Sequence, residues 1–156
     1  MQKAKHPSAF SRFVFLVYCG FMLWLLFGRA YGWVDGLRYE QMLARNINLT
    51  PFLTIRNYLY VIFHSQNERL ILHCVINLLG NVLLFIPAGD LMPKIWKRQR
   101  NFFVFFFTCA VAILLIEFVQ LFTLLGSFDV DDIILNLLGM LLGFLFYHLR
   151  NLWKKQ

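Results

Sequence analysis

Long apolar runs separated by short charged segments set the pattern of this chain. Residues 10–28, 70–89, 101–125 and 131–149 carry few charges. A helix needs about 20 mostly apolar residues to cross the hydrocarbon layer of a bilayer, and all four runs meet or approach that length. The pattern predicts an all-α membrane protein with four transmembrane helices, built as a single domain over residues 1–156.

A cleaved signal peptide is the alternative for the first run, because Lys3, Lys5 and Arg12 precede or begin it. The sequence Gly28-Arg29-Ala30 is a poor cleavage site. We therefore expect this run to remain a helix of the mature protein.

The composition and the positions of the charges agree with this prediction. Hydrophobic residues make up 60% of the chain and charged residues 15%, against about 25% charged residues in a typical soluble domain. Four antiparallel helices would bring ten of the fifteen lysines and arginines to one side: Lys3, Lys5, Arg12, Lys94, Lys97, Arg98, Arg100, Arg150, Lys154 and Lys155. The positive-inside rule then predicts a multi-pass cell-membrane protein with both termini cytoplasmic. The net charge of +7 indicates contact with anionic lipid headgroups and not with nucleic acid.

The loops and breakers add further expectations. The outer connection, residues 29–69, is rich in aromatic residues, and its part 53–64 predicts an amphipathic helix at the membrane interface. Pro87 and Gly89 predict that the second transmembrane helix kinks or ends there. Three cysteines, Cys19, Cys74 and Cys109, have no metal-ligand spacing and are expected to be small buried residues.

Polar residues inside the apolar runs are costly unless they find partners or water, so they are informative. His73, Asn77 and Asn81 lie four residues apart and share one helix face. Glu117 and Gln120 share another, and Asp132 and Asn136 precede Gly139 and Gly143 in the last run. The helix directions place these groups at a common depth in the outer half of the membrane. They predict a polar cavity that opens outward.

A purely structural reading remains open for each residue alone. Amide side chains can join helices by hydrogen bonds, and Gly139 and Gly143 form a pair that suits close helix packing, within the chain or in an oligomer. Asp129 could cap the last helix with Asp132 in its first turn. Asp131 has no role in that scheme. The combination favours a functional pocket.

No catalytic chemistry follows from these residues. Ser127 and His73 lack an orienting third group, so a nucleophilic site cannot be assembled from them. Asp129, Asp131 and Asp132 could hold a divalent ion, but acidic loop residues are usually just solvated. We therefore expect no cofactor and lean away from an enzyme.

Three stretches resemble the VanZ-like family, named for a teicoplanin resistance protein. They are Asn48-Leu49-Thr50-Pro51-Phe52, Asn77-x-x-Gly80-Asn81-x-x-x-Phe85-x-Pro87-x-Gly89, and Glu117-x-x-Gln120 joined to Asp129-x-x-Asp132-x-x-x-Asn136-x-x-Gly139-x-x-x-Gly143. Many members carry an arginine shortly before the first aspartate, where this chain has Gly126-Ser127. Arg56 or another basic residue would then have to pair with the acidic cluster.

The resemblance implies a bacterial multi-pass membrane protein, linked in some members to reduced glycopeptide susceptibility. With the polar residues it suggests a non-enzymatic envelope protein whose outer pocket binds a lipid, a cell-wall precursor or a lipophilic glycopeptide antibiotic of the teicoplanin type. The alternatives are a membrane enzyme that acts on a lipid-linked substrate through Glu117 and the aspartates, and a small oligomeric transporter. The candidate binding residues are Asn48, Arg56, His73, Asn77, Asn81, Glu117, Gln120, Asp129, Asp132 and Asn136.

Overall fold

The computed structural model describes residues 9–28 and 36–153. Its helices are α1 (Ala9–Phe27), α2 (Tyr39–Arg45), α3 (Leu53–His64), α4 (Glu68–Ile95), the short 3-10 helix η1 (Lys97–Arg100), α5 (Phe102–Thr123) and α6 (Val130–Trp153). Two short strands, β1 (Ile47–Asn48) and β2 (Phe128–Asp129), pair in parallel. The sequence pattern did not predict α2, η1 or these strands.

Four of the described helices, α1, α4, α5 and α6, are long and apolar enough to cross a membrane. The four predicted spans are thereby confirmed as helices. Their apolar side chains face outward: Phe13 is 63% exposed, Phe107 63% and Leu115 59%. Such an apolar exterior is what lipid contact requires, since the hydrocarbon layer solvates these side chains.

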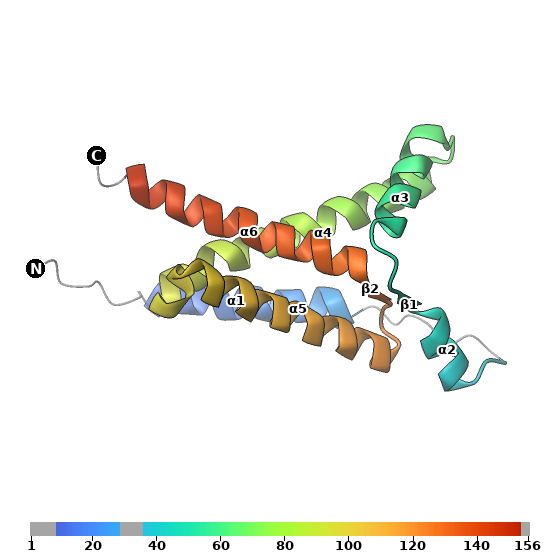
Figure 1. Ribbon diagram of the computed structural model, residues 1–156, viewed down its shortest axis with the longest axis horizontal. Coiled ribbons are helices and arrows are strands. Elements are labelled where there is room, and N and C mark those ends of the chain that lie inside the picture. Colours follow the sequence, from blue (N-terminus) through green and yellow to red (C-terminus); the bar gives the residue numbers. More distant parts are fainter. Residues whose placement is uncertain (1–8, 29–35, 154–156) are drawn as a thin grey trace, which may run out of the picture.

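The ends of the bundle differ in what they hold. α1 begins and α6 ends at one end, whereas α2, α3 and the strand pair lie at the other (Figure 1). At the first end the rings of Phe15 and Trp96 lie edge to face, with centroids 5.2 Å apart. At the second end the Tyr39 hydroxyl donates to the Phe122 carbonyl at 2.7 Å. Hence the chain crosses the bundle four times and returns to the end at which α1 begins.

Of the two alternatives predicted for Pro87 and Gly89, an end of the second span at Gly89 is wrong, because α4 continues to Ile95 with Pro87 and Pro93 inside it; a kink stays a prediction. A proline in a helix has no N–H, so Pro87 cannot donate to the Leu83 carbonyl. The neighbouring Leu84 carbonyl accepts a hydrogen bond from the Tyr18 hydroxyl of α1 at 2.6 Å, which joins α1 to this turn of α4. Gly89 packs against α6 and does not form a turn.

The closest contact in the bundle is between α4 and α6. A Cβ atom added to Gly139 would lie 2.1 Å from the Val82 carbonyl oxygen, and one added to Gly143 would lie 2.1 Å from that of Ile86. The predicted packing role of this glycine pair is therefore realised within the chain. An oligomer contact through the same glycines stays a prediction.

The core between the helices is narrow. Phe105, Cys109 and Ile113 of α5 are fully buried, and Met22, Phe85, Ala88 and Met140 pack with them. Cys74 is buried as well, whereas Cys19 is only half-buried. The cysteine prediction is thus confirmed for Cys74 and Cys109.

Candidate functional site

The polar residues at the second end form two groups with different surroundings. We call the first the capping cluster: Asn48, Thr54, Asp129 and Asp131. The second group lines a cavity between α1, α4, α5 and α6. We call it the outer-end pocket, because the orientation predicted from the sequence would place it at the outer face of the membrane.

Asp131 of α6 caps a different helix, α3. Its carboxylate oxygens accept hydrogen bonds from the backbone N–H of Phe52 at 2.6 Å and of Ile55 at 3.0 Å. These donors are the N-cap and third residues of α3, whose own N-cap side chain makes no capping bond. Asp131 thereby satisfies two N–H groups that the helix leaves free, and its side chain is fully buried. This contact accounts for the aspartate that the sequence left without a role.

Asp129 ties the outer connection to the start of α6. It accepts from the Thr54 hydroxyl at 2.6 Å and from the Asn48 side-chain amide at 3.2 Å. It also accepts from the Asp131 backbone N–H at 2.8 Å, the position that an N-cap residue bonds. The predicted capping role of Asp129 is confirmed. Pairing of Asn48 with Asp129 in the strand ladder brings these groups together.

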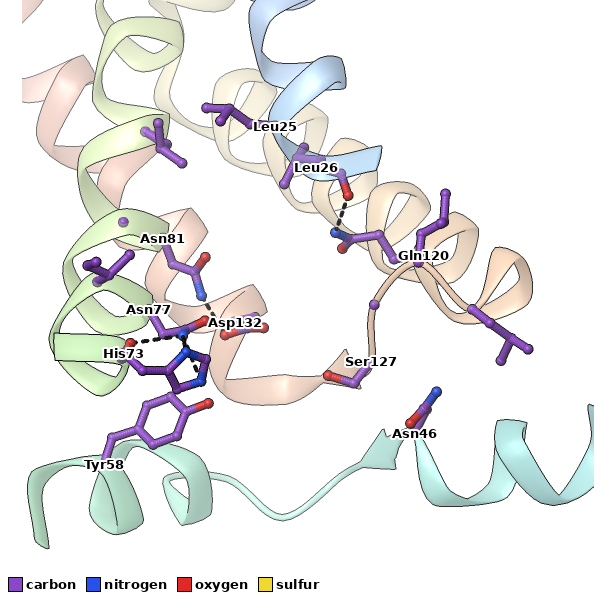
Figure 2. Close-up of a pocket in the computed structure, with 16 residues that line it drawn as sticks. Leu25, Leu26, Asn46, Tyr58, His73, Asn77, Asn81, Gln120, Ser127 and Asp132 are labelled. Carbon is purple, nitrogen blue, oxygen red and sulfur yellow. Dashed lines mark hydrogen bonds between the residues drawn. The ribbon is translucent and has the colours of Figure 1, made fainter. Parts of the chain in front are cut away.

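The outer-end pocket has a volume of about 490 Å³. Its polar lining comes from the side chains of Asn46, Tyr58, His73, Asn77, Asn81, Gln120, Ser127 and Asp132, and its apolar lining includes Leu25, Leu26, Ile76, Leu84 and Leu124 (Figure 2). The cavity is therefore amphipathic. Five of the ten candidate binding residues line it: His73, Asn77, Asn81, Gln120 and Asp132.

His73, Asn77 and Asn81, which we call the α4 stripe, form one polar wall of the pocket. The Asn81 amide donates to the Asp132 carboxylate at 2.5 Å, which joins α4 to α6. One turn earlier, the Asn77 amide donates to the His73 carbonyl at 2.9 Å and lies 3.3 Å from His73 Nε2. The Tyr58 ring of α3 meets the His73 ring edge to face, with centroids 6.2 Å apart. The helix spacing of four residues places these three α4 side chains in one row, as the sequence indicated.

The opposite wall is built by α1, α5 and the loop before α6. The Gln120 amide donates to the Leu26 carbonyl at 3.3 Å, at the end of α1. In Figure 2 Ser127 and Asn46 lie across the cavity from the α4 stripe. Gly126 packs on the Gln120 side chain, where an added Cβ would lie 3.2 Å from Gln120 Cβ. Gly126 and Ser127 thus line the pocket. They occupy the sequence positions at which many members of the family that this chain resembles carry an arginine.

Several candidate residues lie outside this pocket. Glu117 and Asn136 are each 2% exposed and do not line it. The Asp129 backbone N–H donates to the Glu117 carboxylate, with 3.5 Å between nitrogen and oxygen. The side-chain carbonyl oxygen of Asn136 has no hydrogen-bond partner among the described residues. The general acid–base role considered for Glu117 would need access that this position does not give.

Arg56 does not replace the family arginine. It is exposed, and both ion pairs in the described part of the chain involve Asp90 at the other end of the bundle. Hydrogen bonds from backbone N–H groups, Asn48 and Thr54 surround Asp129 and Asp131 instead. Of the two alternatives, Arg56 or another basic residue, neither forms an ion pair with Asp129, Asp131 or Asp132 among the described residues.

The three aspartates considered for a divalent ion do not converge. Asp129 and Asp131 face the outer connection, and Asp132 faces Asn81 in the pocket. Within residues 9–28 and 36–153, no group of three or more His, Cys, Asp or Glu side chains is arranged to hold a metal.

Three residues of the two groups were not predicted from the sequence: Thr54 of the capping cluster, and Asn46 and Tyr58 of the pocket lining. Thr54 and Tyr58 belong to the segment 53–64 that we had considered only as an amphipathic helix. Their spacing of four residues, on the same helix face, was a usable signal. No sequence pattern marked Asn46. It directly precedes β1, and a strand of two residues is too short to be predicted from the sequence.

These features define a small four-span membrane protein with an amphipathic pocket at one end. A family model described as VanZ/LLP1 matches residues 15–151, and the chain belongs to this family. Protein VanZ of Enterococcus faecium is 30% identical over 142 residues, which cover 90% of this chain and 75% of that protein. No solved structure matches the chain.

Proposed function

We propose that the outer-end pocket binds the polar part of an amphipathic molecule whose apolar part lies against α1 and α4. The observation that carries this proposal is the mixed lining of the cavity, with Asn77, Asn81 and Asp132 on one wall and Leu25 and Leu26 on another. A ligand site typically combines an apolar surface with a few convergent polar groups. A lipid, a lipid-linked cell-wall precursor and a lipophilic glycopeptide share the required chemistry.

The proposed orientation places the pocket on the outer side of the cell membrane. The basic residues Lys94, Lys97, Arg98, Arg100 and Arg150 lie at the opposite end, which would face the cytoplasm together with both termini. α3 would then lie at the outer interface. Its exposed aromatic residues support this placement, since Tyr60 is 65% and Phe63 77% exposed.

The proposed biological role is protection against glycopeptides of the teicoplanin type without covalent chemistry. The family resemblance and the similarity to protein VanZ of Enterococcus faecium support this role. In the proposal, the protein binds the antibiotic or its lipid-linked target at the outer surface. The pocket wall offers hydrogen-bonding groups, while the buried Glu117 takes no part in contact with the ligand.

The test is a binding measurement in nanodiscs. The probes are a teicoplanin-type glycopeptide, the same glycopeptide without its acyl chain, and a lipid-linked cell-wall precursor. The Asn77→Leu variant should weaken binding of at least one acylated probe roughly tenfold or more, because a polar ligand group would lose its partner and meet a bulkier side chain. Removal of the acyl chain should also weaken binding.

Asn57→Leu is the matched control, since Asn57 is an exposed amide of α3 that does not line the pocket. Its affinity should equal that of the parent protein. Equal affinities of a folded Asn77→Leu variant and the parent for every probe would overturn the proposal, as would the absence of binding by the parent. Resistance of cells that express each variant should follow the binding order.

A further inference from the structure

A second cavity lies at the basic end of the bundle, remote from the outer-end pocket. It has a volume of about 440 Å³, and its lining includes Met92, Trp96, Lys97, Arg98, Gln99 and Thr108. The lining comes from the end of α4, from η1 and from the second turn of α5. We call it the basic-end cavity. None of the candidate binding residues belongs to it.

The charge of this cavity is positive and uncompensated within the described chain. Lys97 and Arg98 line it, and no acidic residue does. The nearby acidic group, Asp90, already pairs with Lys94 and with Arg150. A cavity with two cations and no carboxylate favours an anionic ligand.

Gln99 adds a hydrogen-bonding requirement. Its Nε2 atom donates to the Thr108 hydroxyl at 3.2 Å, while its buried Oε1 atom has no hydrogen-bond partner among the described residues. A buried acceptor without a donor is costly, so a ligand hydroxyl that meets Oε1 when the half-buried Gln99 side chain turns toward the cavity would stabilise this side chain. The cavity therefore suits an anion that also carries a hydroxyl.

An apolar track leads away from the cavity along α5. Thr108, Val111 and Leu115 recur at helical spacing, and the last two side chains are 56% and 59% exposed. Trp96 lies at the mouth and is 45% exposed, a position typical of tryptophan at the level of lipid headgroups. An acyl chain beside Val111 and Leu115 would thus continue from a headgroup held at Lys97 and Arg98.

We propose that the basic-end cavity is a specific site for an anionic phospholipid of the phosphatidylglycerol type. Its phosphate contacts Lys97 and Arg98, a glycerol hydroxyl donates to Gln99 Oε1, and an acyl chain follows α5. Basic pockets between transmembrane helices bind anionic headgroups in other membrane proteins. The site depends on neither the outer-end pocket nor its ligand.

The test measures lipid retention by native mass spectrometry. The full chain is placed in nanodiscs of equal phosphatidylglycerol and phosphatidylethanolamine, and the lipids that remain bound after extraction are counted. In the double variant Lys97→Gln with Arg98→Gln, the preference for phosphatidylglycerol should fall by roughly tenfold or more. In a second set of nanodiscs, of equal phosphatidylglycerol and phosphatidic acid, Gln99→Leu should reduce the preference for phosphatidylglycerol, because phosphatidic acid lacks the headgroup glycerol and its hydroxyls.

The matched control removes two exposed arginines from the other end, as Arg45→Gln with Arg69→Gln. Its lipid preference should stay within a factor of about two of the parent. Soluble glycerol phosphate should not displace the lipid, since it lacks the acyl chain that α5 contacts. Unchanged preference in a Lys97/Arg98 variant with parental circular dichroism would overturn the proposal, as would an equal loss in the control or displacement by glycerol phosphate.

Discussion

The capping cluster and the outer-end pocket contain neighbouring aspartates in very different surroundings. Asp131 is fully buried, and its carboxylate accepts hydrogen bonds from backbone N–H groups at the start of α3. Asp132, the next residue, is half-buried and bonds to a side chain, Asn81, in the wall of a cavity. A helix turns about 100° between successive residues, so one step along α6 separates the two surroundings.

This difference explains how an acidic run can contribute to both fold and pocket. The capping cluster uses its carboxylates to satisfy backbone N–H groups, which leaves them little capacity for a ligand. In the pocket, Asn81 and Asp132 bond to each other across α4 and α6, whereas Asn77 and Gln120 donate to the backbone carbonyls of His73 and Leu26. Substitutions in the first group should therefore change stability, whereas those in the second should change binding.

The largest effect on stability is expected at the close contact between α4 and α6 that Gly139 and Gly143 allow. Both the capping cluster and the outer-end pocket depend on this contact. Gly139→Ala would place a Cβ atom 2.1 Å from the Val82 carbonyl oxygen, and only separation of the helices can relieve the overlap. We expect a loss of more than about 3 kcal/mol of unfolding free energy. Unfolding in mixed micelles with increasing dodecyl sulfate, followed by circular dichroism, measures it.

Gly20→Ala is the control for this substitution. It lies in α1, and an added Cβ would meet nothing within 4 Å. Its stability should remain within about 1 kcal/mol of the parent. If both alanine variants unfolded alike, the close α4–α6 contact would be refuted.

Asp131→Ala should have the next largest effect. It removes the acceptor of two backbone N–H bonds, and the partly buried donors at Phe52 and Ile55 lose their partner. We expect a cost of about 2 to 4 kcal/mol, measured by the same unfolding assay. Amide hydrogen exchange should show faster exchange at the start of α3.

Asp131→Asn keeps one acceptor oxygen of the two. It should cost about half as much as the alanine variant, because one backbone bond survives. A stability equal to that of the parent for both substitutions would contradict the capping role.

The spans and the α4 stripe were predictable because their signals are periodic. A run of about 20 apolar residues specifies a membrane helix, and spacing by four placed His73, Asn77 and Asn81 on one face. The continuation of α4 past Pro87 was not predictable, since a proline and a glycine usually mark a kink or an end, and the packing of Gly89 on Met140 of α6 is a tertiary contact. The different hydrogen-bond partners of Asp131 and Asp132 were not predictable either, because they depend on where the outer connection folds back onto α6.

Asp132→Asn should have the smallest effect on stability and the clearest effect on the pocket. The Asn81 amide can still donate to a carbonyl oxygen at position 132, so the loss should be below about 1 kcal/mol. Position 132 loses one of its two carboxylate oxygens, however, and a ligand that donates a hydrogen bond to that oxygen should bind roughly tenfold more weakly. Stability and nanodisc binding measured on the same preparation separate the two quantities.

Asp131→Asn is the opposite case, with reduced stability and near-parental affinity in the folded fraction. If Asp132→Asn were as destabilising as Asp131→Asn and bound every probe like the parent, both aspartates would belong to the capping cluster, and the distinction between the two regions would fail.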